Sequence, residues 1–92
     1  MIVTVKAFAT LRMLMPDETR LELKEEPIIA DLLYELKTCY PGVSSELFTD
    51  GGNLNPLVNI LKNGRNIQHL DGLRTLLDYG DIIAVFPSAA GG

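Results

Sequence analysis

Two segments near the start of the chain alternate between apolar and polar side chains. Residues 2–8 and residues 19–24 both follow the two-residue period of a β-strand with one buried face. A turn-forming stretch around Met15, Pro16 and Asp17 separates them. We therefore predict the two arms of a β-hairpin. The side chains predicted to face the core are Val3, Val5, Ala7, Leu21 and Leu23.

The apolar period changes to that of a helix after Ile28. Its apolar positions, three or four residues apart, are Ile29, Leu32, Leu33, Leu36 and Tyr40. Pro41-Gly42 stops this pattern, so one amphipathic helix is predicted. Its start lacks a capping Ser or Thr, a residue typically worth about 1 kcal/mol, although Asp31 in the first turn compensates part of the helix dipole. A short helical turn is expected at residues 44–48.

Strand character returns in the second half of the chain. Residues 57–62 are followed by Asn63-Gly64, a strong hairpin signal because both central residues of a type I′ turn need positive φ. Residues 65–67 should then return as a short strand. The apolar run 82–86 predicts the last strand, which Pro87 ends.

The resulting element order is strand, strand, helix, strand, short strand, strand. This order predicts an α+β fold in which one mixed sheet packs on one main helix. It also predicts that the first and last strands are parallel neighbours, as in the β-grasp arrangement. We expect a single domain, residues 1–92, with a flexible C-terminal tail from residue 87 to residue 92.

Composition and charge exclude several classes of function. The chain has 92 residues and a formal charge of −4 without any basic run, which argues against nucleic acid as a partner. It has no apolar stretch of the roughly 18 residues that a membrane span needs and no secretory signal pattern. No membrane association is expected, and a cytoplasmic location is the default.

The common catalytic and metal-binding motifs are missing from the sequence. A phosphate-binding loop, a zinc-protease helix and paired cysteines do not occur, so we expect no bound metal and no bound cofactor. Cys39 lies three residues after Leu36 and is predicted to be a buried, inert thiol. His69 has no second ligand at a suitable spacing and is predicted to be structural or solvent-facing.

The end of the chain carries the main candidate chemistry. After Pro87 every residue is small, through Ala90 to Gly91 and Gly92, and such a string can extend about 20 Å and thread a narrow channel. A carboxylate at Gly92 is a poor electrophile, so its use would require activation by another protein. A frayed tail without function is the alternative reading.

Two aromatic side chains point to a partner-binding surface. If Val3, Val5 and Ala7 face the helix, alternation sends Phe8 to the opposite face of the sheet, and the same argument applies to Phe86. Were the first and last strands neighbours, these rings would form one apolar patch at the base of the tail. The alternative is that the loop at residues 10–17 covers them.

Several short motifs together resemble the MoaD/ThiS family of ubiquitin-like sulfur carriers, most closely its MoaD branch. They span the chain in order: Phe8-Ala9-Thr10-Leu11-Arg12, residues 60–67, Gly80-Asp81, Phe86-Pro87 and the terminal Gly91-Gly92. Three positions depart from the family pattern. Ser88 replaces a commonly seen proline, Ile82 an acidic residue and Ile28 a capping threonine.

The resemblance implies a specific role as a sulfur carrier. An E1-like adenylating enzyme would use ATP to activate Gly92, a sulfur donor would convert it to a thiocarboxylate, and the tail would deliver the sulfur. In the MoaD branch the recipient is a pterin precursor on a large, MoaE-like synthase subunit. This chain would then be the small, sulfur-donating subunit of a molybdopterin (or tungstopterin) synthase and not an enzyme alone. Gly91 would give clearance, and Phe8, Phe86, Pro87 and Ala90 would contact partners.

Other uses of the same chain end stay open. The main competing hypothesis is a ubiquitin-like modifier, in which the activated Gly92 forms an isopeptide bond with a lysine. The same carrier chemistry elsewhere serves thiamine synthesis or tRNA thiolation. A β-grasp interaction module with an inert tail is a third possibility.

Overall fold

The structure, a computed structural model, describes residues 1–87 and contains a five-stranded sheet with the order β2-β1-β5-β3-β4. Its strands are β1 (Ile2–Ala7), β2 (Glu18–Glu22), β3 (Asn59–Lys62), β4 (Arg65–Asn66) and β5 (Ile82–Phe86). The helices are α1 (Ile29–Cys39) and the single-turn α2 (Ser44–Leu47), and 3₁₀ turns occupy Ala9–Met13, Pro41–Val43, Ile67–His69 and Gly72–Arg74.

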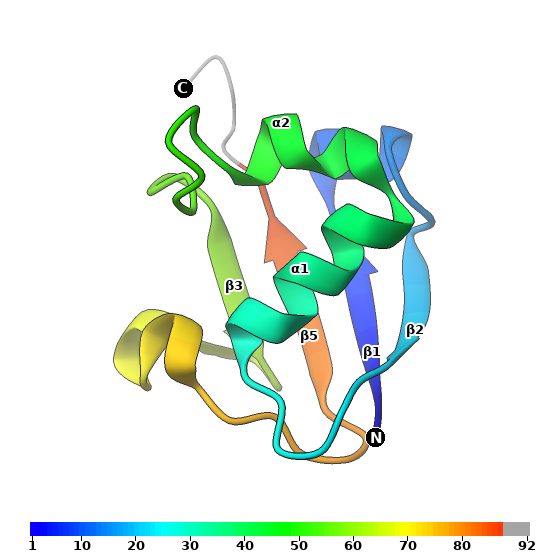
Figure 1. Cartoon of the computed structure of the whole chain (residues 1–92), viewed down its shortest axis with the longest axis vertical. Helices are drawn as coiled ribbons and strands as arrows, with labels where there is room; N and C mark the ends of the chain where they lie inside the picture. The colour runs from blue at the N-terminus through cyan, green and yellow to red at the C-terminus, as the bar shows by residue number, and fades with distance from the viewer. Residues whose placement is uncertain (88–92) are drawn as a thin grey trace.

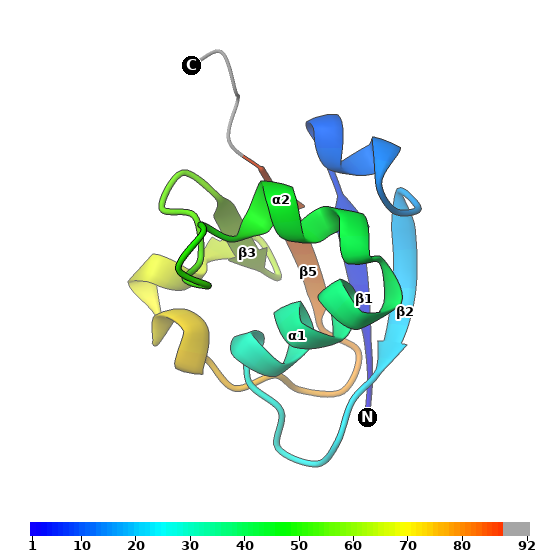
Figure 2. The same ribbon diagram turned by 45° about the horizontal axis from the view of Figure 1, so that its top comes forward.

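The sheet is mixed, and its central pair is formed by the two ends of the chain. β1 pairs with β2 in antiparallel fashion and with β5 in parallel fashion, while β3 is antiparallel to both β5 and β4. α1 lies diagonally across one face of the sheet (Figures 1 and 2). The predicted α+β architecture and the parallel pairing of the first and last strands are both confirmed.

The core lies between α1 and the sheet, and strand alternation selects its members. All five side chains predicted to face the core in the first hairpin are buried. From β5 they are joined by Ile83 and Val85, and from α1 by Ile29, Leu32, Leu33 and Leu36. Burying an aliphatic side chain of this size stabilises the fold by about 1.5–3 kcal/mol, so this layer supplies the main driving force for folding.

The start of α1 is capped from within the helix. The backbone N–H of the N-cap residue Ile28 donates to Oδ2 of Asp31 at 2.8 Å. This is one of the two hydrogen bonds of a capping box; the other needs a polar N-cap side chain, which isoleucine lacks. Asp31 therefore stabilises the helix start through both a hydrogen bond and the helix dipole.

At the other end of α1, Tyr40 follows the helix, and its hydroxyl lies 3.4 Å from Oγ1 of Thr19 on β2.

The prediction for Cys39 was wrong. Its thiol is exposed, and the Sγ atom donates to Oε1 of Glu35 at 3.7 Å. Residue 39 lies at the edge of the apolar stripe in the last helical turn, where the following Tyr40 covers the core instead. A spacing of three residues from Leu36 was therefore not enough to predict burial.

The hairpin at Asn63-Gly64 is present, with φ values of 49° and 86°. Asn63 also ties this hairpin to β5, since its Oδ1 accepts from Ile82 N–H at 2.9 Å and its Nδ2 donates to Oδ1 of Asp81 at 2.9 Å. The expected return strand is shorter than predicted, because Ile67 already begins a 3₁₀ turn. The hairpin is thus fixed by one asparagine that bonds both backbone and carboxylate.

Asp81 is the buried acceptor at the centre of this end of the sheet. It is 6% exposed, its Oδ2 accepts from Asp78 N–H at 2.7 Å, and the same oxygen lies 3.4 Å from Nζ of Lys62. Lys62 also donates to Leu76 O at 2.8 Å and pairs with the Asp78 carboxylate at 3.3 Å. One buried carboxylate therefore joins β3, the loop at residue 78 and the start of β5.

We predict that Asp81→Asn lowers the free energy of unfolding by about 2 kcal/mol, because it removes the charge that strengthens two hydrogen bonds and forms the ion pair with Lys62. Urea denaturation of both proteins measures the difference. Asp78→Asn is the matched control, since its side chain is 78% exposed and pairs with the same lysine; it should cost less than about 1 kcal/mol. An equal loss in both variants would contradict the central role of Asp81.

Candidate functional site

The parallel pairing of β1 with β5 brings Phe8 beside Phe86. Ala7 is paired with Val85, and Phe8 N–H donates to Val85 O at 3.2 Å. The two rings stack, with centroids 4.3 Å apart and an interplanar angle of 12°. Both side chains are half-buried. The two predicted aromatic site residues are therefore in direct contact at the point where the last strand ends.

The stacked rings belong to a larger apolar surface on the face of the sheet opposite α1. On β5, alternation places the half-buried Ala84 and the exposed Ile82 on the same face as Phe86. Leu61 of β3, paired with Ala84, continues this surface. We call Phe8, Leu61, Ile82, Ala84 and Phe86 the aromatic surface. An apolar surface of this kind is typical of a protein interaction site.

The segment between β1 and β2 contributes one side chain to this surface. Cζ of Arg12 lies 5.4 Å from the centroid of the Phe8 ring, while its Nε donates to Ala7 O at 3.0 Å and lies 3.8 Å from Oδ1 of Asp17. The rings are thus bordered by a cation and not fully covered by the loop. Sequence reasoning assigned no role to Arg12, because its position depends on how the 3₁₀ turn folds back onto β1.

The turn that carries Arg12 begins with a strained residue. Ala9 has φ = 54°, a left-handed conformation that non-glycine residues seldom adopt. This conformation reverses the chain directly after Phe8 and starts the 3₁₀ turn Ala9–Met13. Strain of about 1–3 kcal/mol at one residue is tolerated where the surroundings fix it, and such residues often border binding sites.

The remaining predicted site residues fall at or beyond the end of the described chain. Pro87 is buried in the structure of this chain alone. Its contact with a partner protein remains a prediction. Ala90, Gly91 and Gly92 lie outside the described residues, and so does the predicted tail apart from Pro87. What the structure does establish is that the described chain ends beside the aromatic surface, at the end of β5.

Within residues 1–87 the structure contains no group of three or more His, Cys, Asp or Glu side chains that could hold a metal ion. His69 is exposed, as predicted. Of the helices in the described part of the chain, none has both the length and the apolar character needed to cross a membrane.

A mixed five-stranded sheet grasping one helix, with an aromatic surface beside the last strand, defines a ubiquitin-like β-grasp protein. The model of the ThiS family matches residues 5–92, almost the whole chain. This chain therefore belongs to the ThiS family of ubiquitin-like sulfur carriers. The family resemblance predicted from the short sequence motifs is confirmed.

Individual relatives include both modifiers and sulfur carriers. Small archaeal modifier protein 3 of Haloferax volcanii is 39% identical over 89 residues, covering 96% of each chain. A putative sulfur carrier protein of Archaeoglobus fulgidus is 33% identical over 73 residues, covering 78% of this chain and 83% of its own. A solved structure described as a putative molybdopterin converting factor, subunit 1, from Pyrococcus furiosus superposes with a TM-score of 0.77 at 35% identity, covering 96% and 98% of the two chains.

The stacking of Phe8 on Phe86 should be measurable as a coupling energy. We predict that a double-mutant cycle with Phe8→Ala and Phe86→Ala gives a coupling of about 0.5–1.5 kcal/mol, the range for interacting aromatic pairs. Urea denaturation of the wild type, both single variants and the double variant supplies the four free energies. A control cycle pairs Phe8→Ala with Tyr79→Ala, an exposed aromatic residue in the loop before β5, and should give no coupling. Strictly additive effects of Phe8 and Phe86 would contradict the observed contact.

Proposed function

We propose that this sulfur carrier is the small, sulfur-donating subunit of a molybdopterin synthase. Its working group is the carboxylate of Gly92, and the observation that carries the proposal is the aromatic surface placed where β5 ends. From that point only Pro87 and four small residues separate the fold from Gly92. A partner that binds the aromatic surface therefore receives the chain end within about 20 Å of it.

The chemistry divides between this chain and its partners. A carboxylate oxygen of Gly92 attacks the α-phosphorus of ATP on an E1-like enzyme, releasing pyrophosphate and forming an acyl-adenylate. The terminal sulfur of a persulfide donor then attacks the acyl carbon and AMP leaves. This step forms a carbon–sulfur bond and keeps the sulfur–sulfur bond of the persulfide. A thiol then attacks the donor's own sulfur, forms a disulfide with it and leaves a thiocarboxylate on Gly92. This chain supplies the carboxylate, its delivery and the docking surface, whereas its partners supply the catalysis.

The absence of side chains at the last two positions has a physical reason in this scheme. A channel that closes around bare backbone can align the carboxylate with the reacting phosphorus or pterin carbon. An added side chain displaces it, and a misplacement of about 1 Å can cost a factor of about 100 in rate. The similarity to the Pyrococcus furiosus protein supports the pterin as recipient.

A second candidate function is protein modification. It is supported by the 39% identity to a small archaeal modifier protein over nearly the full length of both chains. Here the ε-amino group of a target lysine attacks the carbonyl carbon of the Gly92 acyl-adenylate, AMP leaves, and an isopeptide bond forms with loss of a proton from the nitrogen. Both candidates share the adenylation step and differ only in the nucleophile that follows it. Sulfur transfer to thiamine or tRNA is a third use of the same thiocarboxylate.

We predict that sulfur is carried on Gly92 itself. After incubation with an E1-like enzyme, ATP and a persulfide donor, intact mass analysis should show one oxygen exchanged for sulfur at the C-terminus. Deletion of Gly92 or the substitution Gly91→Val should lower this product at least about 100-fold without changing the free energy of unfolding. Ser88→Ala, which keeps the side chain small, serves as the control and should remain active.

The recipient is distinguished by adding the large synthase subunit and its pterin substrate. Loss of the terminal sulfur together with formation of a dithiolene product supports the molybdopterin role. Conjugates on protein lysines without any accumulated thiocarboxylate would establish the modifier role instead. A chain that is never adenylated would contradict both.

We also predict that the aromatic surface is the docking site for the adenylating enzyme and the large subunit. Replacing Phe8 and Phe86 with alanine should weaken each complex by at least about 2 kcal/mol, a factor of about 30, as truncation of buried aromatic anchors commonly does. Isothermal titration calorimetry measures both affinities, with Tyr79→Ala as the control. Unchanged binding by a folded double variant would refute the docking role.

A further inference from the structure

Strand β2 lies at the edge of the sheet and pairs with β1 alone. The residues that flank β2 show the hydrogen-bonding register: Asp17 O accepts from Ala7 N–H at 2.8 Å, and Leu23 N–H donates to Met1 O at 2.7 Å. The odd-numbered residues of β2 therefore direct their backbone groups toward β1. The backbone groups of Glu18, Arg20 and Glu22 therefore point away from β1. Within residues 1–87 no other strand lies on that side of β2.

A groove of about 560 Å³ lies between the end of this edge strand and α1. It is lined by Glu22, Leu23, Lys24, Glu25, Pro27, Asp31, Tyr34 and Glu35. Leu23 and Pro27 are buried and give it an apolar base, whereas Tyr34 is 65% exposed at its rim. Toward the start of β2 the space is occupied by Tyr40, whose hydroxyl contacts Thr19. The groove thus runs alongside the end of β2, where the backbone groups of Glu22 point away from β1.

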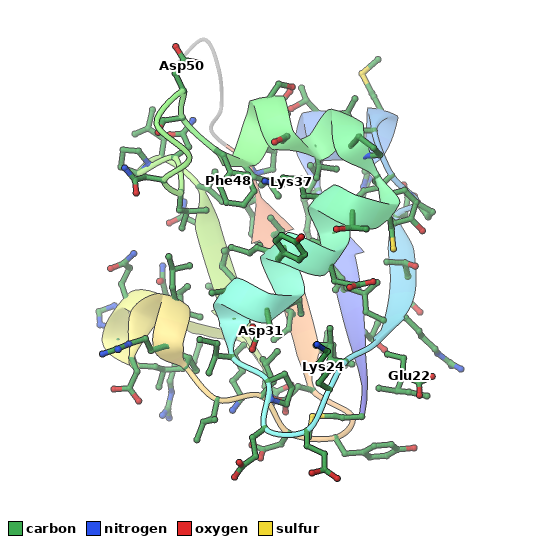
Figure 3. All side chains as sticks on the ribbon, viewed as in Figure 1. Glu22, Lys24, Asp31, Lys37, Phe48 and Asp50 are labelled. Atoms are coloured by element: carbon green, nitrogen blue, oxygen red, sulfur yellow. The ribbon has the colours of Figure 1, made fainter. Side chains whose placement is uncertain are left out.

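The charge of the groove is strongly one-sided. Four of its lining side chains are carboxylates and one, Lys24, is an amine. Asp31 already accepts the Ile28 N–H, and Glu35 accepts only a long bond from Cys39, so most carboxylate oxygens are open to a ligand. Figure 3 shows Glu22, Lys24 and Asp31 at the same end of the molecule, far from Asp50.

The groove is separate from the aromatic surface. α1, which forms one wall of the groove, covers the face of the sheet opposite Phe8 and Phe86 (Figure 1). A ligand in the groove would therefore not compete with a partner bound to the aromatic surface, and the two could be held at once.

We propose that the edge of β2 and the adjacent groove bind an extended, basic segment of a partner protein, which adds to the sheet as a sixth strand. Unpaired edge strands bind peptides in this way: main-chain hydrogen bonds provide affinity and neighbouring pockets select the side chains. Lysine or arginine side chains directed toward α1 meet Glu35, Asp31 and the exposed ring of Tyr34, which attracts cations. A second copy of this chain is disfavoured, because an antiparallel copy of β2 centred on Arg20 would set Glu18 opposite Glu22 and Arg20 opposite Arg20, and like charges directly opposite each other are destabilising.

The proposal is tested with a capped peptide of alternating lysine and valine, added to the ¹⁵N-labelled full chain. Amide shifts should change at Arg20, Glu22, Tyr34 and Glu35, and the affinity should fall with added salt. Glu35→Lys should weaken binding about tenfold or more, which corresponds to about 1.4 kcal/mol. Asp50→Lys makes the same change of charge in an exposed loop and should leave the affinity unchanged.

A second peptide, N-methylated at alternate residues, keeps the charges but cannot donate the main-chain hydrogen bonds of a strand. It should bind at least about tenfold more weakly. The proposal is overturned if the two peptides bind equally well, or if Glu35→Lys and Asp50→Lys change the affinity equally. It is also overturned if the amide shifts are confined to the aromatic surface, if the chain self-associates through β2, or if the first peptide does not bind. Because Glu35→Lys should still acquire the thiocarboxylate on Gly92, a failure here is distinct from a failure of the proposed function.

Discussion

The parallel pairing of β1 with β5 is the contact on which the rest of the structure depends. It joins strands that are far apart in sequence, so its formation closes the chain around α1 and completes the core. The same register sets Phe8 beside Phe86 and brings the end of β5 next to the turn that carries Arg12. One strand pairing therefore both completes the core and places the two rings side by side.

Strand alternation then separates stability from recognition. Inward residues such as Val5 and Val85 are fully buried against α1. The aromatic surface is formed by outward-facing residues of β5 and β3 together with Phe8, which directly follows β1. Changes on the outward face remove little of the core, so that face is free to diverge with its partners. At the opposite end of the sheet Asp81 anchors β5 through buried hydrogen bonds, far from the rings.

Periodicity predicted the parts of the fold that depend on local pattern. The phases of β1 and α1 and the outward direction of Phe8 and Phe86 follow from residue spacing. The positive φ values at Asn63-Gly64 follow from the two residue types, which tolerate the left-handed conformation of a type I′ turn. Cys39 was misassigned because the end of a helix does not follow the stripe of its middle. The contact of Arg12 with Phe8 arises from the fold of an irregular segment, and so does the groove beside β2. Neither has a signature in the sequence.

The proposed chemistry explains why this fold needs no catalytic residues of its own. Adenylation makes the chain end reactive toward sulfur and amines alike, so the outcome depends on which nucleophile the bound partner presents. In this scheme the docking surfaces determine which partner binds, and so whether sulfur transfer or protein modification follows. In the proposed scheme the aromatic surface would serve each step that uses the chain end, because it lies where β5 ends. A second surface on the opposite side, at the edge of β2, would let one partner hold the carrier while another handles the carboxylate.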